Sequence, residues 1–264
     1  MDYSYWQKQT DQKPLFPDIE WSKPERRDQA GRLGIVGGNK LGFAGVAEAY
    51  STAGSSGVGQ LRVLLPDALK KSIPPTITEA IYTVSNPSGG VARNSVGDMK
   101  ALGEWATGIL LIGDAGRNSE TAVAYEQFIE SYSGPLTISR DAIDLIKNNS
   151  HLLVERPDTM LVASFAQTQK LFQAVYYPKM LNFSMQLLQL VEALHKFTTT
   201  YPLTIVTLHK DQLVIAHGGR VVSQEWGSPL KIWRCETAAR MASYWLWNQS
   251  KPLESAVASV AGRN

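Results

Sequence analysis

Residues 33–66 read LGIVGGNKLGFAGVAEAYSTAGSSGVGQLRVLLP and form the most informative segment of the chain. The segment opens with a short apolar run at 33–36, bounded by glycine, which is typical of a buried strand. A turn with little side-chain bulk follows at 37–39, then a helix of small residues at about 43–55, and then a second apolar run at 61–65. A strand, a glycine loop, a helix and a second strand in this order predict a βαβ unit with a right-handed crossover.

The glycine loop would lie at the carboxyl edge of the first strand, where open α/β sheets bind ligands. The amides of Gly37 and Gly38, together with the N-terminus of the next helix, would suit a phosphate. A tight turn that needs glycine only for its backbone conformation is equally consistent with the sequence. The loop is not a Walker A motif, because Gly42 is followed by Phe43 rather than by Lys, and its glycines do not fall in GxGxxG register.

Composition limits the class of protein. The chain has 264 residues, which is enough for one large α/β domain. Its apolar content of 44% and charged content of 19% indicate a globular protein with a sizeable core, and a net charge of +2 does not predict nucleic-acid binding. A single cysteine, Cys235, excludes an intramolecular disulfide and a zinc cluster, and the four histidines show no metal-ligand spacing. We therefore expect no metal site built by the protein alone.

We expect residues 1–30 to form an extended arm that precedes a single domain at 31–264. Leu15, Phe16, Ile19 and Trp21 in this arm are expected to dock on the domain, because a disordered leader would leave four large apolar side chains in water. The N-terminus lacks the apolar region of a signal peptide, and no apolar run reaches the ~18 residues that a spanning helix needs. We expect a cytoplasmic protein with no membrane partner.

Apolar runs and helical patterns alternate through the rest of the chain. Further strands are expected at about 80–84, 109–112, 136–138 and 159–162, and further helices at 98–105, 119–132, 142–147, 165–175 and 180–197. From residue 203 the pattern changes to three short strands, 203–208, 213–216 and 221–223, followed by two helices at 236–247 and 253–260. This order predicts a three-layer α/β/α domain with a mostly parallel sheet and a small C-terminal antiparallel extension.

Four segments together resemble the ADP/ATP-dependent NAD(P)H-hydrate dehydratases, a family with the ribokinase-like fold. The segments are GRLGIVGGNKLGFAG (31–45), ILLIGDAGRN (109–118), PLTISRDAIDLI (135–146) and VTLHKDQLVIAHGGRVVSQEWGSP (206–229). The resemblance covers roughly residues 31–260, with Phe43 where the family usually has Tyr. It implies ADP or ATP, with or without Mg²⁺, and NAD(P)H or its hydrate as ligands.

The chain also departs from the family's motifs. The family's Thr-Pro-His-Pro-Gly-Glu loop falls near VASFAQTQ (162–169), where Gln167 replaces the glutamate. Its Gly-Gly-Thr-Gly-Asp motif falls near RCETA (234–238), where Ala238 replaces the catalytic aspartate. Lys210 lies within a residue of the family's nucleotide-binding lysine. The resemblance therefore implies an inherited scaffold with altered chemistry.

We expect the ligand-binding residues to come from these motifs: Gly37, Gly38, Asn39, Phe43, Gly45, Gly113, Asp114, Ala115, Gly116, Arg140, Gln167, Lys210, Arg234 and Thr237. The catalytic residue stays open, with Glu236, Asp114 and Asp141 as candidate substitutes for the acid that Ala238 lacks. Each has a structural alternative: Asp114 as a turn residue, Asp141 as a helix cap, and Arg234 in a surface salt bridge.

Three functions remain open from the sequence. The first is a protein that binds a nucleotide or dinucleotide, a small-molecule ligand, with weak or lost catalysis. The second is an active dehydratase, or a small-molecule kinase, that uses substitute residues. The third is a non-catalytic oligomeric protein whose arm and tryptophans (226, 233, 245 and 247) make subunit contacts. A homo-oligomer with no nucleic-acid partner is expected.

Overall fold

A computed structural model of the chain describes residues 3–113 and 116–263. The strands are β1 (Trp6–Gln9), β2 (Arg32–Val36), β3 (Gln60–Pro66), β4 (Ala80–Thr83), β5 (Gly108–Leu111), β6 (Leu136–Ser139), β7 (Thr159–Ser164), β8 (Thr204–His209), β9 (Gln212–His217) and β10 (Arg220–Glu225). The α-helices are α1 (Asp18–Trp21), α2 (Ala44–Ser56), α3 (Val96–Trp105), α4 (Ser119–Ser131), α5 (Asp141–Leu145), α6 (His151–Val154), α7 (Phe165–Ala174), α8 (Leu187–Thr200), α9 (Pro229–Trp233), α10 (Glu236–Trp247) and α11 (Pro252–Val260).

The described strands form one ten-stranded sheet in the order β1-β10-β9-β8-β7-β6-β5-β2-β3-β4. All neighbours from β4 to β8 pair in parallel, for example Ile35 with Val63 and with Leu110. Strand β9 is antiparallel to both β8 and β10. The prediction of a mostly parallel sheet with a C-terminal antiparallel extension is confirmed.

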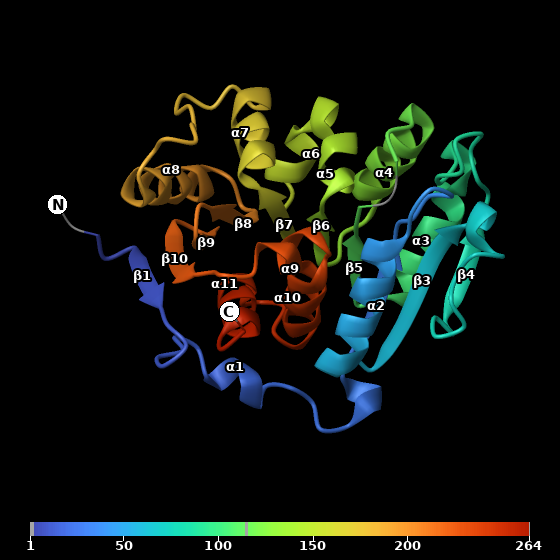
Figure 1. Cartoon of the computed structure of the whole chain (residues 1–264), viewed down its shortest axis with the longest axis horizontal. Coiled ribbons are helices and arrows are strands. Elements are labelled where there is room, and N and C mark those ends of the chain that lie inside the picture. Colours follow the sequence, from blue (N-terminus) through green and yellow to red (C-terminus); the bar gives the residue numbers. More distant parts are fainter. Residues whose placement is uncertain (1–2, 114–115, 264) are drawn as a thin grey trace.

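Helices cover both faces of the sheet (Figure 1). Helices α3 to α8 lie over one face, and α2, α10 and α11 lie over the other. Strand β5 shows how one apolar run serves both layers, because Ile109 and Leu111 enter one core whereas Leu110 and Ile112 enter the other. Side chains alternate along a strand, so a continuous apolar run is what a strand buried on both faces requires. The predicted three-layer arrangement is confirmed.

The N-terminal arm adds a strand to the sheet. Strand β1 pairs in parallel with β10, and the Gln9 side chain donates hydrogen bonds to Gln224 Oε1 (2.8 Å) and to the Val257 carbonyl (3.0 Å). Ile19 is buried in a cluster with Tyr244. Trp21, however, is 88% exposed, so the expectation that it docks is wrong.

One helix begins later than its pattern indicates. Residues 180–186 were expected to be helical, but α8 begins at Leu187. The Gln186 amide donates to Gln189 Oε1 at 2.9 Å, which is half of a capping box that starts the helix there. The segment before it is held by buried Leu181 and Met185. Among the residues that the structure describes, no helix is both long and apolar enough to cross a membrane.

Candidate functional site

The loops that follow β2 and β5 meet at the carboxyl edge of the parallel strands. A Cβ added to Gly37 would lie 3.1 Å from the Gly113 carbonyl oxygen, and one added to Gly116 would lie 2.9 Å from Asn39 Nδ2. These two strands are neighbours in the sheet, so their carboxyl ends emerge side by side. The structure thus brings together the two glycine loops that the sequence placed at this edge. Asp114 and Ala115, also expected here, lie outside the described residues.

Most amides of the first glycine loop bind within the protein. Asn39 and Gly42 exchange backbone hydrogen bonds of 2.9 and 2.8 Å, and the Lys40 amide donates to the Gly89 carbonyl at 2.9 Å. The Leu41 amide donates to the Asn39 side chain at 3.0 Å. What this loop offers an anion is therefore chiefly the positive end of the α2 helix dipole, beside Phe43 and Gly45.

A third loop, NPSGG at 86–90, braces this site, although the sequence indicated only a loop there. Asn86 is buried and donates to the Val91 carbonyl (3.1 Å) and to Thr121 Oγ1 (2.9 Å). Asn39 donates to the Ser88 carbonyl at 3.2 Å, and Asn118 donates to Ser88 Oγ at 2.9 Å. This loop thereby joins the glycine loop to the start of α4. The asparagine before the turn was the available signal, since Asn side chains bond the backbone of turns.

Arg140 follows β6 in a strained conformation, with a φ of 53°. Its side chain lies along the second glycine loop, because a Cβ on Gly113 would come within 2.7 Å of Arg140 Nε. The Gln167 side chain holds this residue by donating to the Arg140 carbonyl (2.8 Å) and to Asp144 Oδ2 (2.7 Å). Strained residues of this kind are concentrated at functional sites. Gln167, expected to bind ligand, thus positions Arg140 and also caps α7.

Replacing Arg140 tests this strain. Arg140→Gly and Arg140→Ala both remove the guanidinium, but only glycine adopts a positive φ without strain. We expect the glycine variant to be more stable than the alanine variant by about 1 kcal/mol. Glycine avoids the strain energy of a positive φ, but it also loses more conformational entropy on folding, which offsets part of that gain. Urea unfolding of the two variants measures the difference. An alanine variant as stable as the glycine variant would show that the backbone is not strained.

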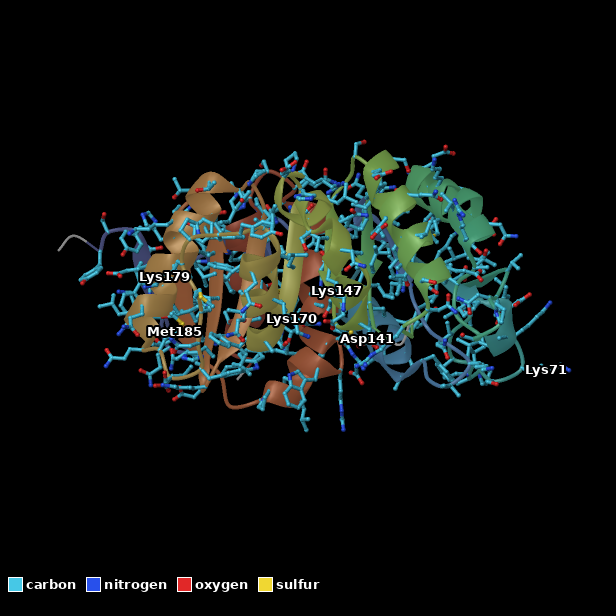
Figure 2. The ribbon with its side chains drawn as sticks, turned by 90° about the horizontal axis from the view of Figure 1, so that it is seen from above. Lys71, Asp141, Lys147, Lys170, Lys179 and Met185 are labelled. Carbon is cyan, nitrogen blue, oxygen red and sulfur yellow. The ribbon has the colours of Figure 1, made fainter. Side chains whose placement is uncertain are left out.

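The acidic candidates have different surroundings. Asp141 is the first residue of α5. Burial of the Tyr125 hydroxyl, and to a lesser extent the negative charge of Asp141, raises the pKa of that hydroxyl, so Tyr125 stays protonated. That hydroxyl is buried and has no hydrogen-bond partner among the described residues. Glu236 accepts a hydrogen bond from Arg240 at 3.1 Å. Figure 2 shows Asp141 in the middle of the molecule, between Met185 and Lys71 at its two ends.

The start of α10 does not expose the position that the resemblance assigns to the catalytic aspartate. Ala238 is fully buried and belongs to the core between α10 and the sheet. Thr237 is also buried, and within the described part of the chain its hydroxyl has no hydrogen-bond partner. Arg234, which ends α9, is exposed. Only Glu236 and Arg234 of this motif therefore present charge toward solvent.

Lys210 lies apart from the glycine loops. It occupies the turn between β8 and β9, three strands from β5, which is roughly 14 Å at the usual strand spacing. Lys210 Nζ and His209 Nε2 both bond the Met185 carbonyl, at 3.4 and 2.9 Å. In this structure Lys210 therefore holds the loop before α8. No group of three or more His, Cys, Asp or Glu side chains that could hold a metal occurs within residues 3–113 and 116–263.

No protein-family model matches the sequence, and no curated protein matches it either. Solved structures are similar in fold. A ribokinase-like superfamily protein from Enterococcus faecalis has a TM-score of 0.73 at 14% identity, covering 98% of this chain and 87% of that chain. The ADP/ATP-dependent NAD(P)H-hydrate dehydratase from Bacillus subtilis, co-crystallised with ATP and Mg²⁺ and soaked with CoA, has a TM-score of 0.62 at 14% identity, covering 92% and 83%. Phosphomethylpyrimidine kinase from Clostridium difficile has a TM-score of 0.55 at 11% identity, covering 85% and 96%. The chain has the ribokinase-like fold.

Proposed function

We propose that the protein binds a nucleotide or dinucleotide at the carboxyl edge of β2, β5 and β6, with weak or lost hydrate dehydration. The observation that carries this proposal is the meeting of Gly37, Gly113 and the strained Arg140 at one edge. Backbone without side chains lets a phosphate approach closely, and a guanidinium binds phosphate through two parallel hydrogen bonds. This edge is also where open α/β sheets bind ligands.

The similar structures support the class of ligand. The Bacillus subtilis dehydratase was co-crystallised with ATP and Mg²⁺, and another neighbour is a kinase. ADP, ATP and NAD(P)H or its hydrate are therefore the ligands to test. Mg²⁺ keeps several waters and binds through one or two carboxylates plus phosphates, so it would arrive with the nucleotide. Asp141, the residue after Arg140, would be the carboxylate that contacts it.

A specific observation favours an interaction function as a second candidate. Leu230 and Trp233, on the short helix α9, are 55% and 59% exposed. Large apolar side chains left in water indicate a contact surface, so a homo-oligomer through α9 is part of the proposal. Trp226 and Trp245, in contrast, are buried in the core, so they take no part in such a contact.

Thermal unfolding with and without ligand tests the nucleotide proposal. At a hundredfold excess over its Kd, a ligand that binds only the folded protein stabilises it by ~2.7 kcal/mol, or roughly 5–10 °C for a chain of this size. Gly116→Val should abolish most of this shift, because its side chain would displace Asn39.

The matched control is Gly218→Val. Gly218 also has a positive φ, of 55°, but an added Cβ there meets no atom within 4 Å. We expect this variant to incur similar backbone strain without displacing a neighbour, and to keep the full ligand-dependent shift. If Gly116→Val responds to ADP, ATP and NAD as strongly as Gly218→Val does, the binding site is not at this edge.

A further inference from the structure

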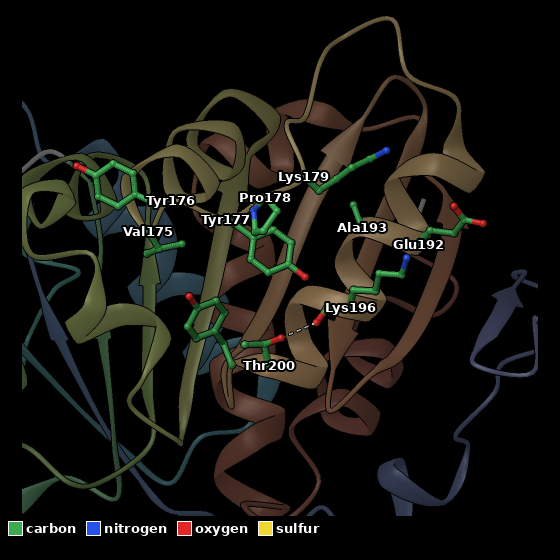
Figure 3. Close-up of a pocket in the computed structure, with 10 residues that line it drawn as sticks. Val175, Tyr176, Tyr177, Pro178, Lys179, Glu192, Ala193, Lys196 and Thr200 are labelled. Carbon is green, nitrogen blue, oxygen red and sulfur yellow. Dashed lines mark hydrogen bonds between the residues drawn. The ribbon is translucent and has the colours of Figure 1, made fainter.

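A pocket lies away from the carboxyl edge, between the end of α7 and the outer face of α8 (Figure 3). It has a volume of about 650 Å³, which is within the range of small-molecule sites. One side comes from the loop 175–179 and the other from α8, where Glu192, Lys196 and Thr200 follow one another at intervals of one turn. None of the residues expected to bind a nucleotide lines it.

Aromatic rings form a rigid wall for this pocket. Phe172 and Phe197 are buried and stack with their centroids 4.1 Å apart. Tyr177 meets both rings edge-on, at 5.1 and 4.9 Å, and Tyr201 lies 4.8 Å from Phe197. Such pairs are favourable beyond the area they bury. Tyr177 and Tyr201, which line the pocket, are therefore backed by packed rings.

The charges around the pocket favour an anion. Lys179 and Lys196 contribute two positive charges and Glu192 one negative charge, which leaves a net charge of +1. Figure 3 shows both lysines on the same side of the Tyr177 ring, with their ammonium groups directed away from it, and Glu192 one turn from Lys196 on α8. Burial raises the pKa of the Tyr177 hydroxyl, with Thr200 opposing the shift, so at neutral pH this hydroxyl is protonated and can donate a hydrogen bond.

The loop that forms one wall is held in place rather than free. Tyr176 has a φ of 52° and is 92% exposed; this left-handed turn lets the next residue, Tyr177, pack inward. Leu181 is buried and its carbonyl accepts from Gln169 at 2.7 Å. The Met185 carbonyl is bound by His209 at 2.9 Å. A pocket with walls fixed before binding has less ordering cost to overcome.

We propose that this pocket binds a small planar aromatic anion, with its ring against Tyr177 and Tyr201 and its carboxylate or phosphate near Lys179 and Lys196. The ring would supply stacking, and the anionic group would offset the net charge of +1. A cation is disfavoured by the same lysines, and a neutral ring would form no ion pair with them. This proposal does not depend on the nucleotide proposal.

Titration of the full chain, followed by ¹H–¹⁵N spectra, tests the proposal with defined probes. The anions are 3-phenylpropionate and phenyl phosphate, which separate a carboxylate from a phosphate. The controls are 3-phenylpropanamide, which lacks the charge, and 3-cyclohexylpropionate, which lacks the planar ring. We expect shifts confined to 175–179 and to α8. We expect at least one aromatic anion to bind about five-fold or more tighter than either control, which is the effect of one good ion pair or ring stack.

Variants locate the site. Lys179→Gln with Lys196→Gln should weaken binding of the anion about ten-fold and leave binding of the amide unchanged. Both side chains are exposed, so the fold should be unaffected. The matched control, Lys147→Gln with Lys251→Gln, removes two exposed lysines elsewhere and should bind as the parent does. Tyr201→Leu should weaken binding of the probes that carry an aromatic ring and leave binding of 3-cyclohexylpropionate unchanged. Equal binding of acid and amide, an unchanged affinity in the double variant, or no saturation by either anion in the millimolar range would overturn the proposal.

Discussion

Purified protein supplied with NADH hydrate and either ADP or ATP is expected to regenerate NADH at or near the uncatalysed rate. The sequence resemblance implies that an aspartate at the start of a helix removes the proton of the substrate hydroxyl, and it assigns that position to Ala238 in this chain. Losing a positioned general base typically costs ~10²–10⁴ in rate. The amides of Arg234 and Cys235, at the positions of the family's glycines, already donate to the Leu230 and Ile232 carbonyls (2.9 and 3.2 Å). The loss of preorganised donors costs a further ~10²–10³, although losses from groups that act together need not multiply.

The structure makes recovery by a single substitution unfavourable. Ala238 is fully buried in the core that α10 shares with α2, so Ala238→Asp would place a carboxylate out of reach of water. Such burial costs several kcal/mol. Glu236 is a poor substitute, because residues two apart on a helix point in different directions and its carboxylate already pairs with Arg240.

The assay therefore compares three proteins: the parent, Ala238→Asp and Ala53→Asp. Ala53 is equally buried, on α2, and controls for the stability lost by burying a carboxylate. All three are expected to leave the hydrate unconverted above background, with both variants destabilised. Parental turnover of roughly 1 per second or more would contradict this expectation and would point to Glu236, Asp114 or Asp141 as the base. Turnover in Ala238→Asp alone would show that the position is accessible after all.

The fold could be predicted from the sequence because most strands lie in apolar runs that only a doubly covered sheet can bury. Strand β5, with Ile109, Leu110 and Leu111 all buried, is such a run. Strand β1 could not be predicted in this way: its sequence is WQKQ, and its pairing with β10 joins residues more than two hundred positions apart. Nothing local distinguishes such an edge strand from a loop.

The candidate site was only partly predictable, for a related reason. The two glycine loops could be recognised from the sequence, because glycines that follow an apolar run indicate a turn after a strand. The strain at Arg140 does not, since a positive φ in a residue other than glycine is imposed by its surroundings. Gln167 shows the same limit: its place in a resembled motif suggested contact with ligand, whereas the structure gives it hydrogen bonds to Arg140 and Asp144.

Replacing Arg156, a partly exposed residue, is expected to lower the free energy of unfolding more than any other replacement of an exposed or partly exposed side chain proposed here. Its guanidinium donates to the carbonyls of Tyr132 (3.0 and 2.8 Å), Pro157 (3.0 Å) and Asp158 (2.8 Å), and also to the Gly134 carbonyl. These carbonyls belong to the loops that enter β6 and β7 at the amino edge of the sheet. One side chain thus fixes how two central strands begin.

Arg156→Met keeps the length of the side chain and removes every one of these hydrogen bonds. Each buried carbonyl left without a partner costs about 1–3 kcal/mol, and because Arg156 is only partly buried, water will satisfy some of them. We therefore expect a loss of about 3 kcal/mol in the free energy of unfolding. Arg156→Lys should recover less than half of it, since an ammonium cannot reproduce the fork of a guanidinium.

Urea unfolding of these variants measures the loss, with Arg26→Met as the control. Arg26 is exposed and pairs only with exposed Asp28 among its described ion pairs, so its replacement should cost about 0.5 kcal/mol or less. The amino edge is opposite the proposed ligand site, and the stabilisation by nucleotide should therefore be unchanged in Arg156→Met. A lysine variant as stable as the parent would show that charge alone, rather than the set of hydrogen bonds, holds the two loops. Loss of the stabilisation by nucleotide in Arg156→Met would show that disorder at the amino edge of β6 and β7 also disrupts the ligand site at the carboxyl edge.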